Sequence, residues 1–491
     1  PVRAPEGMTL KGEGVRTEYG DRVSREWAYT HEGVITSWEK FEKYDWPKAD
    51  NFDLSKWSVF DRILPKGMKA ILLLGKIYTP AWMYMGAETF FNALEQDEEL
   101  VAAIINKIGE IQYQTFLRVI EHPCVGAVIN PDDIAFNTGL LVHPKYLRKH
   151  VFPWYQKMGR ICREKGIGFV LHSDGDCTEV MDDLIDCGFH GFNPVQPNAM
   201  NIVEVKKRWG KKLCLIGNIN LDSTLTLGTP EDVRAEVYER IRTIAPGGGY
   251  MVASSNSITD YVPVKNMRAL LDAAYEFGKY PIRLEEGGVK GKIWTSQTKI
   301  RRSETTKVKT GLDVEAYAES LIADDVPKLI DMMQREIDGG MAAGEVVCRG
   351  MIPAITVAGE MFQNGQIYIP EMMIAARAMS EALDHFKPIL AGKGEARPLG
   401  KVVIGTVHGD LHDIGKNLVL MVLQGQGFQV EDLGVSVSTE KFIQAVRNRK
   451  PDILAMSALL TTTMIEMKNT IDALKSEGLR DVVKIIVGGA P

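Results

Sequence analysis

The residues best suited to chemistry gather in three clusters between positions 401 and 489. The clusters are Asp410, His412 and Gly415 as D-x-H-x-x-G, then Ser457 and Leu459 as S-x-L, and last the adjacent pair Gly488 and Gly489. An imidazole nitrogen is a common metal ligand, and a carboxylate bonded to the other ring nitrogen fixes its tautomer. Glycines let the backbone come close to a bulky ligand. These residue types therefore suit metal ligation in a crowded site.

Each cluster follows an apolar run that predicts a buried parallel strand. The runs are KVVIGTV (401–407), PDILAM (451–456) and VVKIIV (482–487), and the amphipathic stretch 416–428 predicts a helix after the first of them. Open α/β sheets bind ligands beyond the carboxyl ends of their strands. The three clusters are therefore expected to meet at one edge of a sheet.

This set of motifs resembles the cobalamin-binding module of corrinoid proteins and methionine synthase. The resemblance implies a flavodoxin- or Rossmann-like domain that binds cobalamin or a related corrinoid. By this resemblance His412 is the axial ligand of cobalt, and Asp410 is the carboxylate bonded to its other ring nitrogen. Ser457 then extends this hydrogen-bond relay as its third member. The residues that shape the slot for the nucleotide tail are then Gly415, Leu459, Gly488 and Gly489.

Four amphipathic segments precede this module, in residues 311–393, and predict a small helical bundle. Within it, the run GEMFQNGQIYIPEM (359–372) resembles the helical cap of methyl-carrying corrinoid proteins. The resemblance implies that Phe362 and Ile369 shield the upper face of the corrin. Ile369 departs from the leucine of the family pattern.

Residues 70–280 alternate apolar runs with amphipathic stretches. The runs are 70–75, 124–130, 168–175, 189–197, 213–220 and 249–255. Repeated β-α units of this kind predict a (β/α)8 TIM-like barrel whose first strand is missing, with an open doubly wound sheet as the alternative. The chain begins without methionine and stops directly after a strand, so we expect terminal segments to be absent at both ends.

Polar clusters stand at three predicted strand ends of the barrel, where barrel enzymes place their active sites. Asp132 and Asp133 follow the second run, His172 and Asp174 follow the third, and Asn193–Pro197 follow the fourth. A single aspartate there is equally well a helix N-cap, and a single histidine a satisfied core residue. Taken together, the clusters favour a catalytic site formed by Asp132, Asp133, His172 and Asp174.

The barrel resembles the uroporphyrinogen decarboxylase superfamily, through stretches such as PDDIAFNTGLLVHPKYLRKH and HSDGDCTEVMDDLIDCGFHGFNPVQP. That superfamily includes corrinoid-dependent methyltransferases, and the attached corrinoid module selects this branch. Thiol methyltransferases of the branch bind zinc through H-x-C and a distant cysteine. This chain has Asp174 at the first cysteine and Ser254 and Ser255 near the second. Zinc at His172 and Asp174 stays open, but the chain is more similar to the O-demethylases of anaerobes, which use one-carbon units from methoxylated aromatics.

Composition narrows the classes of partner. A net charge of −6 and a pI near 6.0 argue against binding nucleic acid or an anionic membrane. The sequence has no apolar run long enough to span a bilayer. The six cysteines are scattered without a C-x-x-C pair, which indicates a reducing cytoplasm.

The sequence thus predicts four parts: a methyltransferase barrel (1–286), a linker (287–310), a helical cap (311–396) and a cobalamin-binding α/β domain (397–491). By resemblance, the enzyme moves a methyl group from a small O-methyl donor to Co(I) of its own corrinoid domain. The implied partners are a second methyltransferase that passes the methyl to folate or a thiol, and a reductive activator protein. The alternatives are a methyl-corrinoid to thiol (coenzyme M type) methyltransferase and a non-catalytic barrel that docks the carrier.

Overall fold

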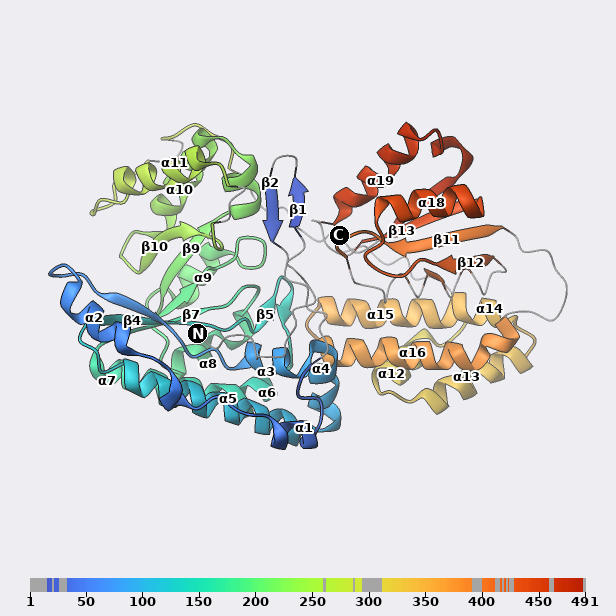
Figure 1. Cartoon of the computed structure of the whole chain (residues 1–491), viewed down its shortest axis with the longest axis horizontal. Helices are drawn as coiled ribbons and strands as arrows, with labels where there is room; N and C mark the ends of the chain where they lie inside the picture. The colour runs from blue at the N-terminus through green and yellow to red at the C-terminus, as the bar shows by residue number, and fades with distance from the viewer. Residues whose placement is uncertain are drawn as a thin grey trace. The chain divides into compact units, whose positions relative to one another are not determined.

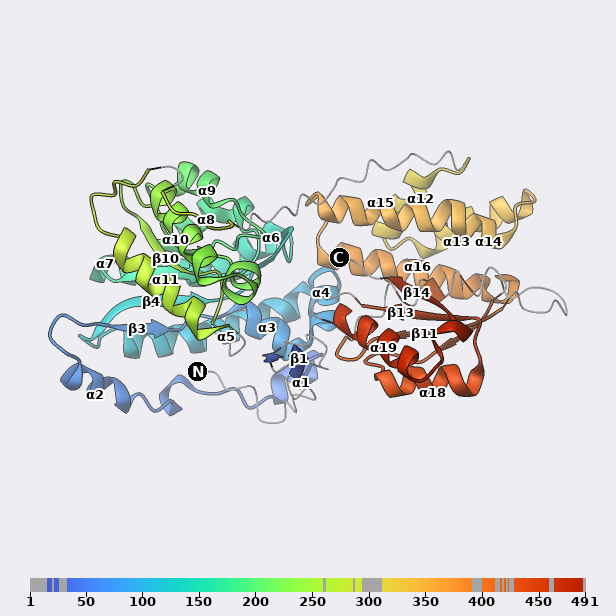
Figure 2. The same cartoon turned by 90° about the horizontal axis from the view of Figure 1, so that it is seen from above.

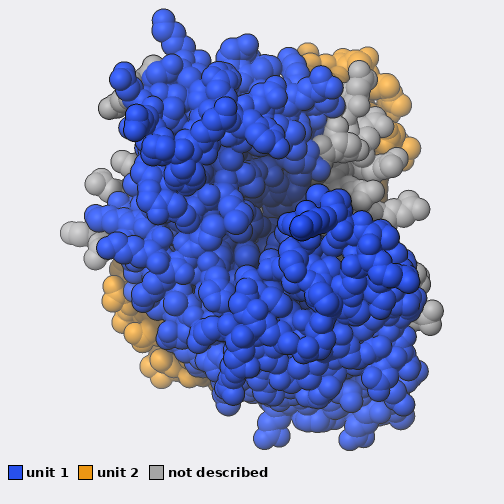
Figure 3. Space-filling view, turned by 90° about the vertical axis from the view of Figure 1, so that its left-hand side faces the viewer, with its two compact units in different colours: residues 1–11, 31–305, 363–370 blue, residues 12–30, 306–362, 371–491 orange. Residues whose placement is uncertain are grey.

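The computed structural model describes residues 16–19, 22–25, 33–258, 262–285, 288–293, 311–390, 400–410, 416, 419, 420, 423, 428–458 and 463–488. The chain separates into two compact units, shown in different colours in Figure 3. Unit 1 comprises residues 1–11, 31–305 and 363–370, and unit 2 comprises residues 12–30, 306–362 and 371–491. Each unit is described by itself.

Unit 1 is built on a curled sheet of parallel strands (Figure 1). Its described strands are β3 (Ala70–Leu73), β4 (Val125–Pro131), β7 (Gly168–His172), β8 (Gly191–Asn193), β9 (Cys214–Ile219) and β10 (Tyr250–Ser254). Their spatial order, β10-β9-β8-β7-β4-β3, follows the chain in one direction without reversal. A doubly wound sheet reverses its strand order at a switch point, so the open-sheet alternative is wrong for this unit. The predicted TIM-like barrel class is confirmed.

Helices alternate with these strands. They are α1 (Trp38–Lys43), η1 (Ala49–Asn51), α2 (Ser55–Ile63), α3 (Tyr78–Met85), α4 (Ala87–Gln96), α5 (Glu98–Val119), α6 (Pro144–Tyr146), η2 (Leu147–Val151), α7 (Phe152–Lys165), η3 (Thr178–Val180), α8 (Met181–Asp186), α9 (Ile202–Trp209), η4 (Leu221–Leu225), α10 (Pro230–Ile244) and α11 (Val264–Phe277). A short hairpin, β5 (Ala135–Phe136) and β6 (Gly139–Leu140), follows β4.

Local sequence explains where these elements begin and how they pack. Helix α10 starts at a capping box, in which the Thr229 side chain accepts from the Asp232 amide and the Asp232 carboxylate accepts from the Thr229 amide. Along β7, Phe169 and Leu171 are fully buried while their neighbours are partly exposed, as the two-residue period of a strand requires. The Phe169 ring stacks on Phe189 with centroids 4.1 Å apart. This packing fixes the strand end that carries His172.

Unit 2 contains the predicted helical bundle. Its helices are α12 (Val314–Ile322), α13 (Val326–Asp338), α14 (Ala343–Val346), η5 (Val347–Met351), α15 (Ile352–Gln363) and α16 (Ile369–Leu390), the last beginning within the segment assigned to unit 1. The turn η5 has π-helical hydrogen bonding and ends two residues before Pro353. Proline has no backbone N–H that could donate to the carbonyl four residues earlier. A wider turn just before it is therefore expected.

Unit 2 also contains a second parallel sheet, in the order β12-β11-β13-β14. Its elements are β11 (Lys401–Thr406), β12 (Gln429–Asp432), α18 (Thr439–Arg449), β13 (Ile453–Ser457), α19 (Met464–Ser476), η6 (Arg480–Val482) and β14 (Lys484–Gly488). The strand order reverses between β11 and β13, which makes that pair the switch point of a flavodoxin-like sheet. Figure 2 shows α18 and α19 together on one face. The predicted flavodoxin- or Rossmann-like class is confirmed.

The remaining described strands, β1 (Arg16–Tyr19) and β2 (Arg22–Arg25), form an antiparallel hairpin. The domain boundaries stay predictions, because residues 294–310 of the proposed linker and 391–399 near the last boundary lie outside the described residues. Within the described parts of the chain, no helix combines the length and apolar character that a membrane span needs.

Candidate functional site

Three polar side chains come together at the carboxyl ends of β4 and β7. The ligand atoms of Asp133, His172 and Asp174 all lie within 4.8 Å of one another, and each residue is partly exposed. Strands β4 and β7 are parallel neighbours that pair Pro131 with His172. Residues just past these two positions therefore meet at the same edge, which is where the sequence predicted a site.

The orientation of His172 is set by the end of β8. Its Nδ1 lies 2.5 Å from Oδ1 of Asn193, whose own Nδ2 donates to the carbonyl of Ile216 over 3.3 Å. Because the Asn193 amide nitrogen is engaged with that carbonyl, its oxygen is the atom that faces the histidine. The ring therefore donates a proton from Nδ1, and Nε2 of the neutral imidazole carries the lone pair.

The two carboxylates are oriented from other strand ends. Asp133 Oδ1 accepts from the Asp174 amide over 3.0 Å, and the Asp133 amide donates to Oγ1 of Thr79 over 3.2 Å. Asp174 Oδ2 accepts from Nδ2 of Asn256 over 2.8 Å. Asn256 follows β10, where Ser254 donates to the Asn256 carbonyl over 2.6 Å. Residues after β3, β4, β7, β8 and β10 thus position one cluster.

Asp132 lies in a different environment from its neighbour. It is fully buried, and its two oxygens accept five hydrogen bonds of 2.6–2.7 Å, from the amides of Ile77, Tyr78 and Thr79, from the Thr79 hydroxyl and from the Tyr155 hydroxyl. The carboxylate thereby holds the first turn of α3. This environment argues against the catalytic role predicted for Asp132, and we leave it out of the proposed site.

The thiol closest in sequence to the cluster is that of Cys177. It is fully buried and donates to Oγ of Ser173 over 3.5 Å, and burial raises its pKa to about 12. Among the described residues, the potential metal ligands that gather at this edge are Asp133, His172 and Asp174, and Cys177 is not one of them. Ser255, near the position of the second family cysteine, accepts from the Leu221 amide over 3.0 Å.

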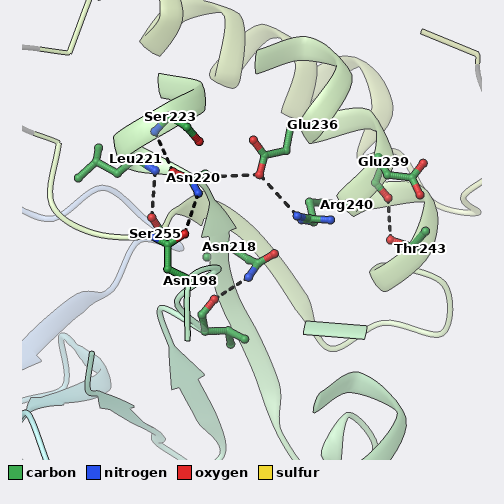
Figure 4. A network of polar contacts seen from close by, with 12 residues as sticks. Asn198, Asn218, Asn220, Leu221, Ser223, Glu236, Glu239, Arg240, Thr243 and Ser255 are labelled. Atoms are coloured by element: carbon green, nitrogen blue, oxygen red, sulfur yellow. Dashed lines mark hydrogen bonds and ion pairs between the residues drawn. The ribbon is translucent and has the colours of Figure 1, made fainter. Parts of the chain in front are cut away.

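A further polar network supports the loop after β9 (Figure 4). The Asn220 amide donates to Oε1 of Glu236 over 3.2 Å, and Arg240 lies 3.6 Å from the same oxygen. Glu236 is fully buried, and burial raises the pKa of its carboxyl, although Thr224 and Arg240 oppose this effect. The Asn220 side chain donates to Oδ1 of Asn198 over 3.3 Å. This network fixes the loop and takes no part in the cluster around His172.

In unit 2, Asp410 stands just past β11, at the switch point. It is fully buried, and Oγ1 of Thr463, also fully buried, donates to its Oδ2 over 2.7 Å. The preceding Gly409 has φ +79°, a conformation that favours glycine, and Ser436 donates its amide to the Asp410 carbonyl over 2.9 Å. Ser436 thus fixes the backbone of Asp410, and Thr463 fixes its carboxylate.

The hydroxyl that the structure places on Asp410 belongs to Thr463, a residue that the sequence analysis missed. Ser457, the predicted third member of the relay, ends β13 and is half-buried beside Thr406 and Gly488. Thr463 is the last of three consecutive threonines that follow the S-x-L motif, and this run of hydroxyls was the available signal.

The other predicted corrinoid residues divide into two groups. His412, Gly415, Leu459 and Gly489 lie outside the described residues. Gly488 ends β14 and is exposed, and a Cβ placed there would meet no atom of the described residues within 4 Å. Phe362 in α15 and Ile369 at the start of α16 are half-buried, and their shielding of a corrin stays a prediction.

Comparison with known proteins defines the class. The uroporphyrinogen decarboxylase family matches residues 36–277, and two B12 binding domain families match residues 314–387 and 400–491. A corrinoid protein of Desulfitobacterium hafniense is 37% identical over 180 residues, covering 36% of this chain and 83% of its own length. The trimethylamine corrinoid protein 1 of Methanosarcina acetivorans is 37% identical over 181 residues, with coverages of 36% and 84%.

Solved structures with related sequences include the monomethylamine corrinoid protein of Methanosarcina barkeri, at 30% identity and TM-score 0.32, covering 36% of this chain and 84% of that one. A methyltransferase from Methanosarcina mazei matches at 20% identity and TM-score 0.39, with coverages of 45% and 63%.

The family matches define a protein that binds a corrinoid and carries a barrel of the uroporphyrinogen decarboxylase kind in the same chain. The chain belongs to the corrinoid protein family, and the same chain also carries a domain that matches the uroporphyrinogen decarboxylase family. The described residues fit the cofactor: a buried, hydrogen-bonded carboxylate at Asp410 stands at the switch point, and none of the described residues fills the space in which a Cβ at Gly488 would lie. The predicted corrinoid cofactor is confirmed.

Proposed function

We propose that the chain moves a methyl group from an oxygen-linked donor to the corrinoid held by its own C-terminal module. A methoxylated aromatic is the donor that the site suits best. The observation that carries the proposal is the cluster of Asp133, His172 and Asp174 at the strand ends of the barrel. These are oxygen and nitrogen donors, in a place where thiol-methylating relatives of the barrel use cysteines.

The reaction explains why such a cluster is useful. When the carbon–oxygen bond of an aryl methyl ether breaks, both electrons stay on oxygen, and phenolate is a poor leaving group. The bound corrinoid supplies the nucleophilic cobalt and the electron pair for the new bond to carbon. The barrel must therefore align the ether and stabilise negative charge on oxygen. His172 can do this as an imidazolium, which donates from Nε2 while Nδ1 stays bonded to Asn193, and the cluster can also do it through a bound ion.

A thiol as the methyl acceptor of the barrel is less well supported. Thiol-methylating relatives of the barrel use cysteines to hold the zinc that activates the thiol, whereas the group of potential ligands among the described residues here is Asp133, His172 and Asp174, without a cysteine. The methylamine names of the relatives do not decide the donor either, because those proteins match about a third of this chain. We propose that the methyl group then passes to folate or a thiol on a second methyltransferase, and that a reductive activator restores the cobalt.

Addition of methyl donors to the anoxically reduced, corrinoid-loaded chain tests this function. We expect methoxyarenes to change the corrinoid absorbance in a single turnover. Loss of one stabilising contact typically costs about 3 kcal/mol, roughly a hundredfold in rate, so His172→Ala is expected to be slower by about that factor. Asp176→Asn is the matched control, since Asp176 caps Thr178 and stands outside the cluster.

Two outcomes would contradict the proposal in different ways. Reaction of methylamines or methyl thioethers, with methoxyarenes inert, would show that the donor class is wrong. A wild-type rate for the His172→Ala variant would show that the chemistry takes place elsewhere in the barrel.

A further inference from the structure

We propose that Lys416 and Asp432 position the loop that carries His412, the predicted cobalt ligand, by fixing one end of this loop to the turn after β12. The inference concerns how the corrinoid is held and does not depend on which methyl donor reacts. It rests on the assignment of His412 as the ligand, which a variant of His412 itself checks.

Lys416 is buried on a helical face that is otherwise apolar. The residue is helical and only 2% exposed. Leu420 and Leu423, four and seven positions further on, pack against the core residues Val402 and Ile404 of β11. Residues at these intervals share one helical face, so the pattern calls for an apolar side chain at position 416. A lysine is almost never buried in such a place unless it is paired with an opposite charge.

The partner of Lys416 is Asp432, the last residue of β12. The Lys416 ammonium forms an ion pair with Oδ2 of Asp432, and Oδ1 of the same carboxylate accepts from the Gly434 amide over 2.9 Å. Asp432 lies in register with Ile404, and residues in register point to the same face of a sheet. Asp432 therefore faces the helix that carries Lys416, and its carboxylate joins this helix to the turn after the strand.

The same turn also holds the other end of the ligand loop. Oγ of Ser436 accepts from the Gly409 amide over 3.1 Å, and the Ser436 amide donates to the Asp410 carbonyl over 2.9 Å. Ser436 has φ +49°, a strained value for a residue other than glycine, which persists only where the surrounding structure requires it. Residues 432–436 therefore contact the chain both before and after His412.

The chemistry of the pair favours a positioning role over a contribution to stability. A buried ion pair gives up hydration that its own attraction barely restores, so apolar side chains of the same size usually stabilise a fold as well or better. What the pair adds is a fixed register, because a shift of the helix along the sheet would leave both charges buried and apart. Lys416 stands four residues after His412, about one helical turn, so the position of the ligand loop follows from this register.

The test loads the full-length chain with aquocobalamin and compares the absorbance spectrum and affinity of variants at neutral pH. His412→Ala supplies the spectrum that lacks the histidine ligand. We expect Lys416→Met and Asp432→Asn each to shift the spectrum toward that of His412→Ala and to weaken cobalamin binding by about tenfold or more. The double variant should bind about as weakly as the single variants, because the two residues act as one pair.

Glu431→Gln is the matched control for Asp432→Asn. Glu431 is the preceding residue of β12, is about half exposed and pairs with Arg449 of α18, so the loss of its charge should leave the spectrum and affinity of bound cobalamin unchanged. Asp432 is 34% exposed, so its asparagine variant decides the test even if Lys416→Met does not fold. The urea midpoint of each unloaded variant is measured in parallel, because it reports stability apart from the cofactor.

Three outcomes would overturn the proposal. Wild-type spectra and affinities for Lys416→Met and Asp432→Asn, with a lowered urea midpoint, would show that the pair serves only stability. An equal change in Glu431→Gln would show that any loss of charge from β12 has this effect. A wild-type spectrum for His412→Ala would leave the pair no ligand to position, whereas the methyl donor proposed above would be unaffected.

Discussion

Two adjacent aspartates, Asp132 and Asp133, should respond in opposite ways to the same isosteric change. Asp132→Asn replaces one oxygen of a fully buried carboxylate that accepts five hydrogen bonds. In the less costly orientation the new amide nitrogen faces the Thr79 amide, which is left without its acceptor. One such buried donor costs about 1–3 kcal/mol, and loss of charge weakens each remaining bond by about 1 kcal/mol. With three bonds remaining on the other oxygen, from Ile77, Tyr78 and Tyr155, we expect a loss of roughly 4–6 kcal/mol of unfolding free energy.

The assay is urea denaturation followed by tryptophan fluorescence. Six of the eight tryptophans lie between positions 38 and 209, within unit 1, so most of this signal follows the barrel part of the chain. Asp133→Asn is the control. Asp133 is partly exposed and accepts from the Asp174 amide, so its change should cost less than about 1 kcal/mol while it reduces metal binding and methyl transfer. A stable Asp132→Asn variant with wild-type unfolding but no methyl transfer would refute this assignment and restore Asp132 to the catalytic site.

Four further outcomes are expected. Thr463→Val should alter the spectrum of the bound corrinoid, because the buried carboxylate loses its donor, and Thr463→Ser should restore it. Asn193→Leu should weaken metal binding by about tenfold or more, and Asn193→Asp, which keeps an acceptor for His172, should weaken it less. A carboxyl whose folded pKa is raised contributes stability that is lost as pH rises, so Glu236→Gln should stabilise the barrel more at about pH 8 than at about pH 5, as melting temperatures would show. Cleavage within 287–310 should slow methyl transfer at micromolar protein but not at millimolar protein, because a tether supplies an effective concentration on the order of millimolar. Equal rates for the cleaved and the intact protein at micromolar concentration would exclude this role of the linker.

The fold could be predicted from the sequence because its signals are local. Apolar runs of strand length alternate with amphipathic stretches, and the strands of both sheets lie within these runs or overlap them. The choice between a barrel and an open sheet could not be made in this way, because it depends on which strands pair across the chain. The order β10-β9-β8-β7-β4-β3 decides it, and this order is a long-range property.

At the candidate site, too, the sequence predicted what local signals determine and missed what depends on long-range contacts. The grouping of Asp133, His172 and Asp174 was predictable, because parallel strands end at a common edge. The separate role of Asp132 was not, because its five donors include three amides some fifty residues earlier in the chain. Thr463 was missed for a similar reason, since its partner Asp410 is 53 residues away and no spacing rule connects them.

The central claim is that the barrel transfers an oxygen-bound methyl group to the corrinoid of its own chain. The most direct measurement is a single turnover under anoxic conditions, in which the reduced, corrinoid-loaded chain is mixed with a methoxyarene labelled in its methyl group. We predict that the label appears on the corrinoid of the same protein, together with one equivalent of the demethylated phenol, and that both are lost in the His172→Ala variant. Contradiction would be an unlabelled corrinoid with no phenol, while a methylamine or methyl thioether labels it readily.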